Sequence, residues 1–241
     1  MPLSLDPHAV HVRYAWSSAL AAPERLARGL CLLSEEEQAR AARFHFDRDR
    51  QSYVLAHALA RTLLAQLAGV APETLRFALG EHGRPELVWP ELQPRVRFNI
   101  SHTHGLVACA LALEHDVGVD VEHVERRVEI DRLAPNVFSP GERDALLPLR
   151  DAALRTRFFQ LWTLKEAYIK ARGMGLALPL REITFHLDGR ARPEIELAPS
   201  IGDDAARWWL DVRPLGEGHM LALALAAEPQ SISISELDPT A

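Results

Sequence analysis

Lysine and cysteine are scarce in this chain of 241 residues. Lysine and arginine together number 27, yet the only lysines are Lys165 and Lys170, so arginine supplies almost all of the positive charge. One explanation is a GC-rich genome that replaces lysine with arginine and leaves a pair by chance. The other is that these two positions need a compact ammonium, to which a guanidinium is not equivalent. Cys31 and Cys109 lie far apart, which predicts neither a disulfide framework nor a cysteine-rich zinc site.

Long apolar runs and an excess of positive charge are also missing. The longest apolar runs, residues 106–113 and 220–227, have the length of strands and fall far short of the roughly 20 residues that span a bilayer. The net charge of −6 argues against a general nucleic-acid binder. No basic region followed by an apolar region marks a signal peptide, so we expect a cytoplasmic protein. The 48% of hydrophobic residues predicts a globular chain with a real core.

Two stretches in different halves of the chain resemble each other. Residues 77–87 and 185–195 share a phenylalanine, a leucine and the run Arg-Pro-Glu in the same positions, and residues 104–114 loosely resemble residues 219–228. The likeness favours an internal duplication over a chance similarity of strand-turn-strand segments.

A duplication predicts two similar α+β halves related by pseudo-two-fold symmetry, residues 1–116 and 117–241. The cleft between two such halves is a natural ligand site. A chain that carries both halves is expected to work as a monomer.

Capping signals and hydrophobic periodicity locate the main elements. Ser34 with Glu37 and Ser139 with Glu142 match capping boxes at the starts of two helices. We expect the polar residues 228–241 to be loosely attached. The other expected elements are helical residues up to Gly69 with a break near Asp47, a helix over 152–171 that ends at Gly173, and strands over 76–79, 95–100, 106–113, 118–124, 208–212 and 220–227.

Two acids alternate along one expected strand. Asp120 and Glu122 point to the same side, because residues i and i+2 of a strand share a face. Neighbouring carboxylates repel and are costly to bury unless a cation lies between them. Oxygen ligands of this kind suit Mg²⁺, and an exposed strand with ordinary surface acids is the alternative.

One stripe of the long helix carries Trp162, Glu166 and Lys170, at i, i+4 and i+8. Such a Glu–Lys spacing is usually a surface ion pair, but this helix is apolar over much of its surface. Glu166 is therefore a candidate third metal ligand and Lys170 a candidate phosphate ligand. Lys165 lies about 100° around the helix from Glu166 and should not share its ligand.

Two further groups of residues are weaker signals. Ser101 next to His102 suggests a nucleophile and a base, without an acid beside them. His102 and His104 with Asp120 weakly suggest zinc. Arginine forks suit phosphate oxygens, although a solvated helix face is the simpler interpretation of these residues: Arg40, Arg43, Arg48, Arg50 and Arg84.

Taken together, these pieces resemble the 4'-phosphopantetheinyl transferases, specifically the longer, surfactin-synthetase-activating class. The family's fold is two similar α+β halves with the active site in the cleft between them. The matching motifs follow the family's order over about residues 40–180: Gly83-Arg-Pro85, Phe98-Asn-Ile-Ser-His102, Gly118-Val-Asp-Val-Glu122, Phe138-Ser-Pro-x-Glu142 and Trp162-x-x-Lys-Glu-x-x-x-Lys170.

The resemblance implies transfer of the 4'-phosphopantetheine group of coenzyme A to a serine of an apo acyl or peptidyl carrier protein, with release of 3',5'-ADP. Fatty-acid, polyketide and nonribosomal peptide carriers all remain open. It implies Mg²⁺ held by Asp120, Glu122 and Glu166, and a pyrophosphate contact by Lys170. The implied coenzyme A contacts are Arg40, Gly83, Arg84, Pro85, Asn99, Ser101 and His102. Arg84 stands where relatives often carry lysine.

In the implied reaction, the acceptor hydroxyl attacks the β-phosphorus of coenzyme A, and Mg²⁺ and Lys170 stabilise the developing charge. Asp120 and Lys170 are catalytic by the same resemblance, and Glu166 is the candidate base, directly or through a metal-bound water. A metal-dependent phosphoester hydrolase with the same acids is one alternative. A noncatalytic carrier-binding module is another, but it would be expected to have lost an acid or Lys170.

Overall fold

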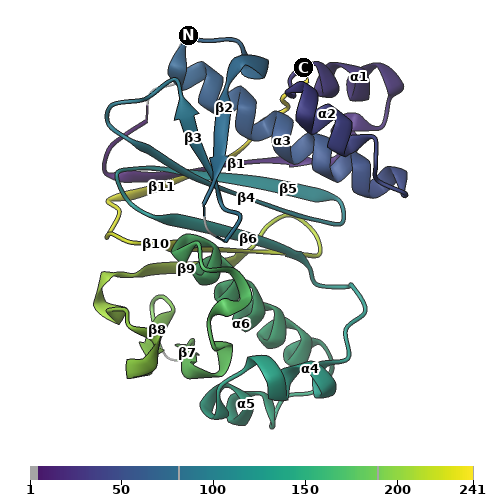
Figure 1. Ribbon diagram of the computed structural model, residues 1–241. Helices are drawn as coiled ribbons and strands as arrows, with labels where there is room; N and C mark the ends of the chain where they lie inside the picture. The colour runs from purple at the N-terminus through teal and green to yellow at the C-terminus, as the bar shows by residue number, and fades with distance from the viewer. Residues whose placement is uncertain (1–4, 81, 189, 241) are drawn as a thin grey trace. The chain divides into compact units, whose positions relative to one another are not determined.

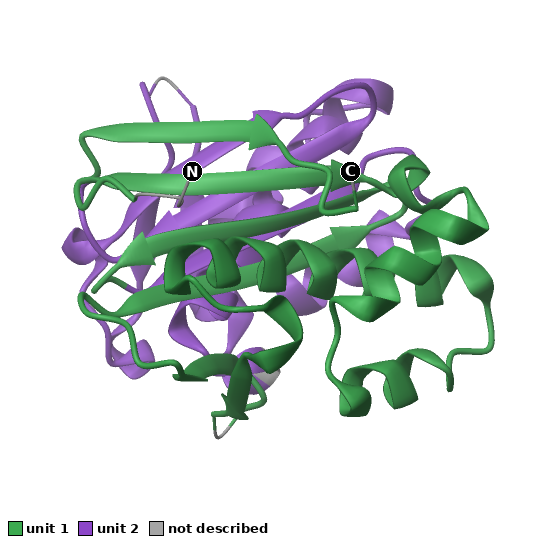
Figure 2. Cartoon of the chain, turned by 90° about the horizontal axis from the view of Figure 1, so that it is seen from above, with its two compact units in different colours: residues 1–115, 229–241 green, residues 116–228 purple. Residues whose placement is uncertain are grey.

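The computed structural model describes residues 5–80, 82–188 and 190–240, and the chain divides into two compact units (Figure 2). Unit 1 comprises Met1–His115 and Pro229–Ala241, and unit 2 comprises Asp116–Glu228. None of the helices in the described ranges is both long and apolar enough to cross a membrane. Each unit joins helices to a sheet whose strands are mostly antiparallel, so the expected α+β class is confirmed.

Unit 1 is built on a four-stranded sheet in the order β11-β1-β5-β4. The 22-residue helix α3 packs against this sheet, and a separate hairpin, β2-β3, follows the helix (Figure 1). The elements of unit 1 are β1 (Ala9–Trp16), α1 (Pro23–Cys31), α2 (Glu35–Ala41), α3 (Asp47–Ala68), β2 (Arg76–Leu79), β3 (Pro85–Trp89), β4 (Val96–Thr103), β5 (Leu106–Leu113) and β11 (Ser231–Glu236), with 3₁₀ turns at Ser17–Leu20 and Pro72–Thr74.

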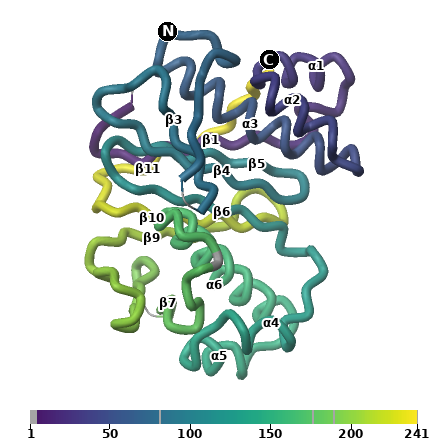
Figure 3. Tube along the Cα trace, viewed as in Figure 1, coloured from purple at the N-terminus to yellow at the C-terminus, as the bar shows by residue number. Residues whose placement is uncertain are grey.

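Strand β11 overturns the expectation of a loose C-terminus. Residues Ala9–Tyr14 of β1 pair in parallel with Ser231–Glu236, and the yellow end of the chain runs beside the purple first strand in Figure 3. The serine–isoleucine alternation of β11 is the strand signal that two flanking prolines had obscured. Residues 229–241 thus belong to unit 1, whereas the sequence analysis placed them in the second half.

Unit 2 is built on a three-stranded sheet in the order β6-β10-β9. The helix α6 also has 22 residues, packs against all three strands, and is followed by the separate hairpin β7-β8. The elements of unit 2 are β6 (Val117–His123), α4 (Ile130–Val137), α5 (Pro140–Leu146), α6 (Asp151–Arg172), β7 (Ile183–His186), β8 (Glu194–Leu197), β9 (Trp209–Pro214) and β10 (His219–Leu225), with 3₁₀ turns at Gly175–Ala177, Leu180–Glu182, Pro199–Ile201 and Ala205–Arg207.

Both units run through the same succession of elements. Each begins with a strand, continues through two short helices and one long helix, and ends with a hairpin followed by two strands. In both, the first strand pairs with the second of these two strands, as β1 with β5 and β6 with β10, and unit 1 adds β11 on the other side of β1. This shared order supports the duplication inferred from the sequence repeat.

A buried ion pair ties the elements of unit 2 together. Lys165 of α6 and Glu142 of α5 are both fully buried and lie 2.8 Å apart, Nζ to Oε2. The ammonium also donates to the carbonyls of Leu180 and Ile183, at 2.9 and 2.5 Å. Glu142 in turn accepts from the backbone N–H of Phe185. Lys165 thus has three acceptors for three donors, which satisfies a charge that would otherwise be costly to bury.

Unit 1 carries the counterpart of this ion pair. Glu37 of the capping box on α2 accepts from Arg61 Nε of α3 at 2.5 Å, and Arg61 Nη1 donates to the carbonyls of Pro72 and Leu75. Burial alone would raise the pKa of Glu37, but the hydrogen bonds and charges of His57 and Arg61 outweigh it and lower that pKa to about 2. Each unit therefore joins its second helix and its long helix through one ion pair, whose buried cation also binds carbonyls at or just before the hairpin.

The long helix of unit 2 approaches its sheet at Gly118 of β6. A Cβ on Gly118 would lie 2.0 Å from the carbonyl oxygen of Ala167 and 2.5 Å from the backbone nitrogen of Ala171. Both are backbone atoms of α6 and cannot rotate away. Glycine is therefore required here for space, and the missing side chain sets how closely α6 packs on β6.

Replacing Lys165 by methionine should lower the free energy of unfolding by about 3–5 kcal/mol, because Glu142 loses its buried counter-ion. Arg132→Met is the matched control, since its pair with Glu129 is 84% and 71% exposed and should contribute less than about 1 kcal/mol. Chemical denaturation of both variants measures the difference. Equal losses in the two variants would contradict the role assigned to Lys165.

Gly118→Ala should destabilise the protein by about 1–3 kcal/mol, because α6 has to shift away from β6. Gly141→Ala is the control of opposite sign, since its nearest neighbour is Thr184 Cγ2 at 4.0 Å. Alanine is favoured over glycine within a helix such as α5 by about 0.5–1 kcal/mol. Thermal and chemical unfolding of the two variants test this, and a Gly118→Ala protein as stable as the wild type would refute the packing argument.

Candidate functional site

Three acids and a lysine gather where α6 lies along β6 in unit 2. Lys170 Nζ lies 2.6 Å from Oδ1 of Asp120, which is buried in β6. Trp162 Nε1 donates to Glu122 Oε1 at 2.7 Å. The stripe predicted on the helix therefore faces the two acids predicted on the strand.

Glu122 also pairs with an arginine that follows it closely in the sequence. Arg126 donates two hydrogen bonds to its carboxylate, from Nε at 2.8 Å and from Nη2 at 3.0 Å. Arg155 of α6 donates to the carbonyls of Val124 and Arg126 and so fixes the segment that carries Arg126. Sequence analysis missed both arginines, because Glu122 lies in a strand and Arg126 in the turn after it, where a spacing of four residues predicts no contact.

Glu166 is the acid most affected by its surroundings. Burial raises the pKa of its carboxyl to about 6, and the negative charges of Asp120 and Glu122 act in the same direction, against the positive charges of Lys170 and Arg126. The negative charges of Asp120 and Glu122 thus act on the carboxyl of Glu166. Such a group can bind a cation or exchange a proton.

In the structure, the ammonium of Lys170 pairs with Asp120 and the guanidinium of Arg126 pairs with Glu122. Within the described parts of the chain, no three His, Cys, Asp or Glu side chains lie close enough together to hold a metal ion. His102 and His104 belong to unit 1 and Asp120 to unit 2, and the zinc interpretation of these residues stays a prediction. Oxygen donors are nevertheless what Mg²⁺ prefers, and Asp120, Glu122 and Glu166 supply only carboxylates.

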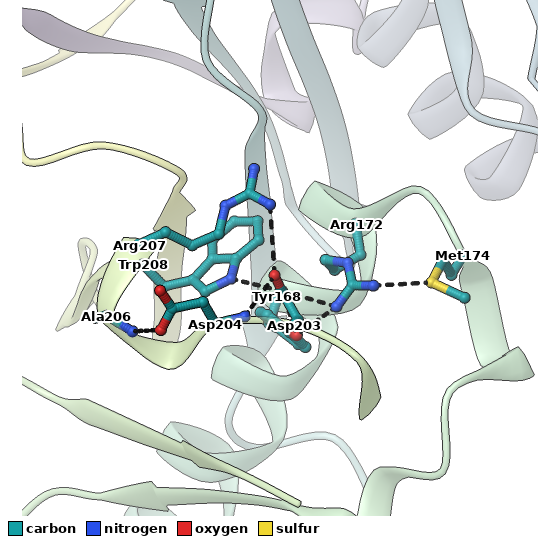
Figure 4. A network of polar contacts seen from close by, with 8 residues as sticks. All are labelled: Tyr168, Arg172, Met174, Asp203, Asp204, Ala206, Arg207 and Trp208. Carbon is teal, nitrogen blue, oxygen red and sulfur yellow. Dashed lines mark hydrogen bonds and ion pairs between the residues drawn. The ribbon is translucent and has the colours of Figure 1, made fainter. Parts of the chain in front are cut away.

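Beyond Lys170, the end of α6 is anchored by one buried acid, Asp203. Its Oδ2 accepts from Tyr168, Arg172 and Trp208 at 2.7–2.8 Å, and Figure 4 shows these side chains converging on it. Burial of Asp203 opposes ionisation, but these donors outweigh it and lower its pKa. The network fixes the last turn of the helix that carries Glu166 and Lys170.

The predicted coenzyme A contacts lie in unit 1, mainly along β4 and at the β2-β3 hairpin. Asn99 and Ser101 are buried in β4, and His102 is exposed. We expected the strand to end before Ser101, but β4 continues to Thr103, because it pairs with β5 along its whole length. Gly83 sits in the hairpin turn with φ of +81°, a conformation that favours glycine.

Two of these predicted contacts, Arg40 and Pro85, line a cavity of about 1110 Å³ in unit 1. The guanidinium of Arg40 lies over the ring of Tyr53, 5.6 Å from its centroid. Tyr53 in turn contacts His57, and His57 Nδ1 lies 3.0 Å from Glu37 Oε1. Sequence analysis did not single out Tyr53 or His57, because neither belongs to a recognised motif.

Comparisons with known proteins divide the chain as the two units do. A family model described as the 4'-phosphopantetheinyl transferase superfamily matches residues 116–224, and one described as 4'-phosphopantetheinyl transferase, N-terminal, matches residues 16–114.

Two full-length relatives extend these matches. The 4'-phosphopantetheinyl transferase HetI of Nostoc sp. is 33% identical over 199 residues, which is 82% of each chain. The 4'-phosphopantetheinyl transferase Sfp of Bacillus subtilis is 30% identical over 173 residues, 72% of this chain and 75% of Sfp. Among solved structures, holo-[acyl-carrier-protein] synthase of Neisseria meningitidis aligns with 46% of this chain and 95% of its own, at 20% identity and a TM-score of 0.40. The chain therefore belongs to the 4'-phosphopantetheinyl transferases of the Sfp type, enzymes that transfer a phosphopantetheine group to carrier proteins.

Proposed function

We propose that this enzyme takes the phosphopantetheine group from coenzyme A, places it on a serine of an apo acyl or peptidyl carrier protein, and releases 3',5'-ADP with the help of Mg²⁺. The observation that carries the proposal is the meeting of Lys170 with Asp120 beside Glu166 and Glu122. A phosphoryl-type transfer needs this combination, because negative charge builds up on the pyrophosphate as the bond breaks.

Asp120, Glu122 and Glu166 are the residues we assign to Mg²⁺. Three carboxylates fit a hard cation, and the effect of Asp120 and Glu122 on the pKa of Glu166 supports a shared site. Lys170 and Arg126 now balance Asp120 and Glu122, so metal binding would compete with these ion pairs. When bound, Mg²⁺ supplies positive charge to the pyrophosphate.

The chain's own groups then have defined tasks. The serine oxygen forms a bond to the β-phosphorus, and the bond from that phosphorus to the bridging oxygen of the ADP portion breaks. Lys170 places an ammonium against the pyrophosphate oxygens, and Glu166 accepts the serine proton. Asp203 and Arg155 help to position these groups, since Asp203 holds the end of α6 and Arg155 holds the segment after β6.

We assign the nucleotide portion of coenzyme A to residues of unit 1. Arg40, which lines the cavity there, and Arg84 supply guanidinium groups suited to phosphate. The other assigned contacts are Gly83, Pro85, Asn99, Ser101 and His102. The pseudo-two-fold relation of the halves and a monomeric enzyme belong to the same proposal, supported by the order of elements that the units share.

Incubation with an apo carrier protein, coenzyme A and Mg²⁺ should give one pantetheinyl adduct, read by intact mass. Asp120→Asn, Glu166→Gln and Lys170→Arg should each lower the rate by about 100-fold or more, and chelation of the metal should abolish transfer. Glu129→Gln is the control, because its carboxylate is 71% exposed and pairs only with Arg132 among the described contacts.

Failure to modify any of several carrier proteins would refute the proposal. Release of 3',5'-ADP without an adduct would favour the rival hydrolase. A Lys170→Arg enzyme with normal turnover and normal affinity for coenzyme A would show that the two lysines are neighbours by chance.

A further inference from the structure

The network around Asp203 at the end of α6 is tighter than its hydrogen bonds alone indicate (Figure 4). The side chain of Asp203 is only 5% exposed, and one of its oxygens accepts from three donors. The ring of Tyr168 packs edge-on against Trp208, with the ring centroids 5.0 Å apart. The guanidinium of Arg172 lies 5.8 Å from the centroid of Tyr168. Buried charge-assisted hydrogen bonds of this kind hold their groups in one arrangement.

The two long helices of the chain provide an internal comparison for this network. Both α3 and α6 have 22 residues and end at a glycine in the left-handed conformation, so their positions correspond one to one. Tyr168 and Arg172 correspond to Leu64 and Ala68 of α3, whose side chains have no hydrogen-bond donor. At these positions unit 1 ends its long helix without polar side chains. The duplicated fold therefore does not require the network.

The candidate site differs between the units in the same way. Glu166 and Lys170 correspond to Thr62 and Gln66 of α3, so these positions of unit 1 carry neither the acid nor the ammonium. The donors to Asp203 and the charged groups of the site thus occur together on one of the two helices. This links the network to the site rather than to the fold.

The geometry of α6 explains how the network acts on the site. Lys170 lies two residues from both Tyr168 and Arg172, which is about 200° around the helix from each. The network therefore holds the side of α6 that faces away from Lys170. If the last two turns rotated or shifted, Lys170 Nζ would leave its place 2.6 Å from Asp120 Oδ1.

We propose that Asp203 is a positioning residue, which acts through Tyr168 and Arg172 to hold the ammonium of Lys170 in the candidate site. The effect on the reaction rests on the proposed function, in which Lys170 contacts the pyrophosphate. Loss of the network should then lower the rate of transfer more than the affinity for coenzyme A, because most of the assigned coenzyme A contacts lie in unit 1.

The scarcity of lysine allows a direct test by nuclear magnetic resonance. Protein labelled with ¹³C at lysine Cε gives two side-chain signals, from Lys165 and Lys170, and Lys170→Arg identifies them. Asp203→Asn keeps the size of the side chain but removes its charge and one acceptor oxygen. The Lys170 signal should shift, and the Lys165 signal should stay, because Glu142 and two carbonyls bind Lys165 independently of Asp203.

Turnover gives a second readout. With saturating coenzyme A and carrier protein, Asp203→Asn should lower kcat by about 10- to 100-fold, the cost of a small misplacement of a catalytic group. KM for coenzyme A should stay close to that of the wild type. Tyr168→Phe leaves two of the three donors, so it should change the Lys170 signal and kcat in the same direction but by less. It replaces Asp203→Asn in the test if that variant fails to fold.

The matched control is Asp238→Asn, since Asp238 is a carboxylate of unit 1 that accepts from Arg25 and Thr240. This variant should leave both lysine signals and kcat unchanged. A shift of both signals in Asp203→Asn, a shift of neither, or a normal kcat would overturn the positioning role. Wild-type protein that transfers nothing would instead overturn the proposed function, and the lysine signals would still test whether Asp203 positions Lys170.

Discussion

The close packing of α6 on β6 is the constraint on which the candidate functional site depends. Gly118 has no side chain, so the helix backbone comes within a distance that any Cβ would block. The same strand face continues through Asp120 and Glu122, and the helix stripe opposite carries Glu166 and Lys170. Because the three acids and Lys170 are all attached to these two elements, the separation of α6 from β6 sets whether the acids and the ammonium meet. Asp203 and the Glu142–Lys165 pair hold the helix from its other sides.

The equivalent ion pairs of the two units explain why residue 165 is a lysine. Lys165 is fully buried, with its ammonium on Glu142 and two carbonyls and with Phe138 and Phe185 within 6 Å. A planar guanidinium with five donors would not fit three acceptors at one point. Unit 1 has Arg61 in the equivalent position. Its Nε donates to Glu37, and its Nη1 donates separately to the backbone carbonyls. Lys165 is thus structural, whereas Lys170 pairs with Asp120 in the candidate site.

Local signals made most of this architecture predictable. Both capping boxes are present, α3 and α6 end at Gly69 and Gly173, and the stripe on α6 faces the predicted acids. These features are encoded within a few residues of sequence. The pairing of β11 with β1 and the partners of Lys165 depend on residues far apart in the chain, and no local pattern specifies them. The role of Arg126 is an intermediate case, because its spacing from Glu122 is local but its anchoring by Arg155 is not.

The central claim is that Asp120, Glu122 and Glu166 form a divalent-cation site. Without the cation, Lys170 and Arg126 neutralise Asp120 and Glu122 through the observed ion pairs. Electron paramagnetic resonance of Mn²⁺ as a substitute for Mg²⁺ tests this without an activity assay. In the presence of coenzyme A, the wild type should bind one Mn²⁺ per chain, and Glu166→Gln should weaken that binding by about tenfold or more, which corresponds to about 1.4 kcal/mol. Equal Mn²⁺ affinity in the wild type and in Glu166→Gln would contradict the account.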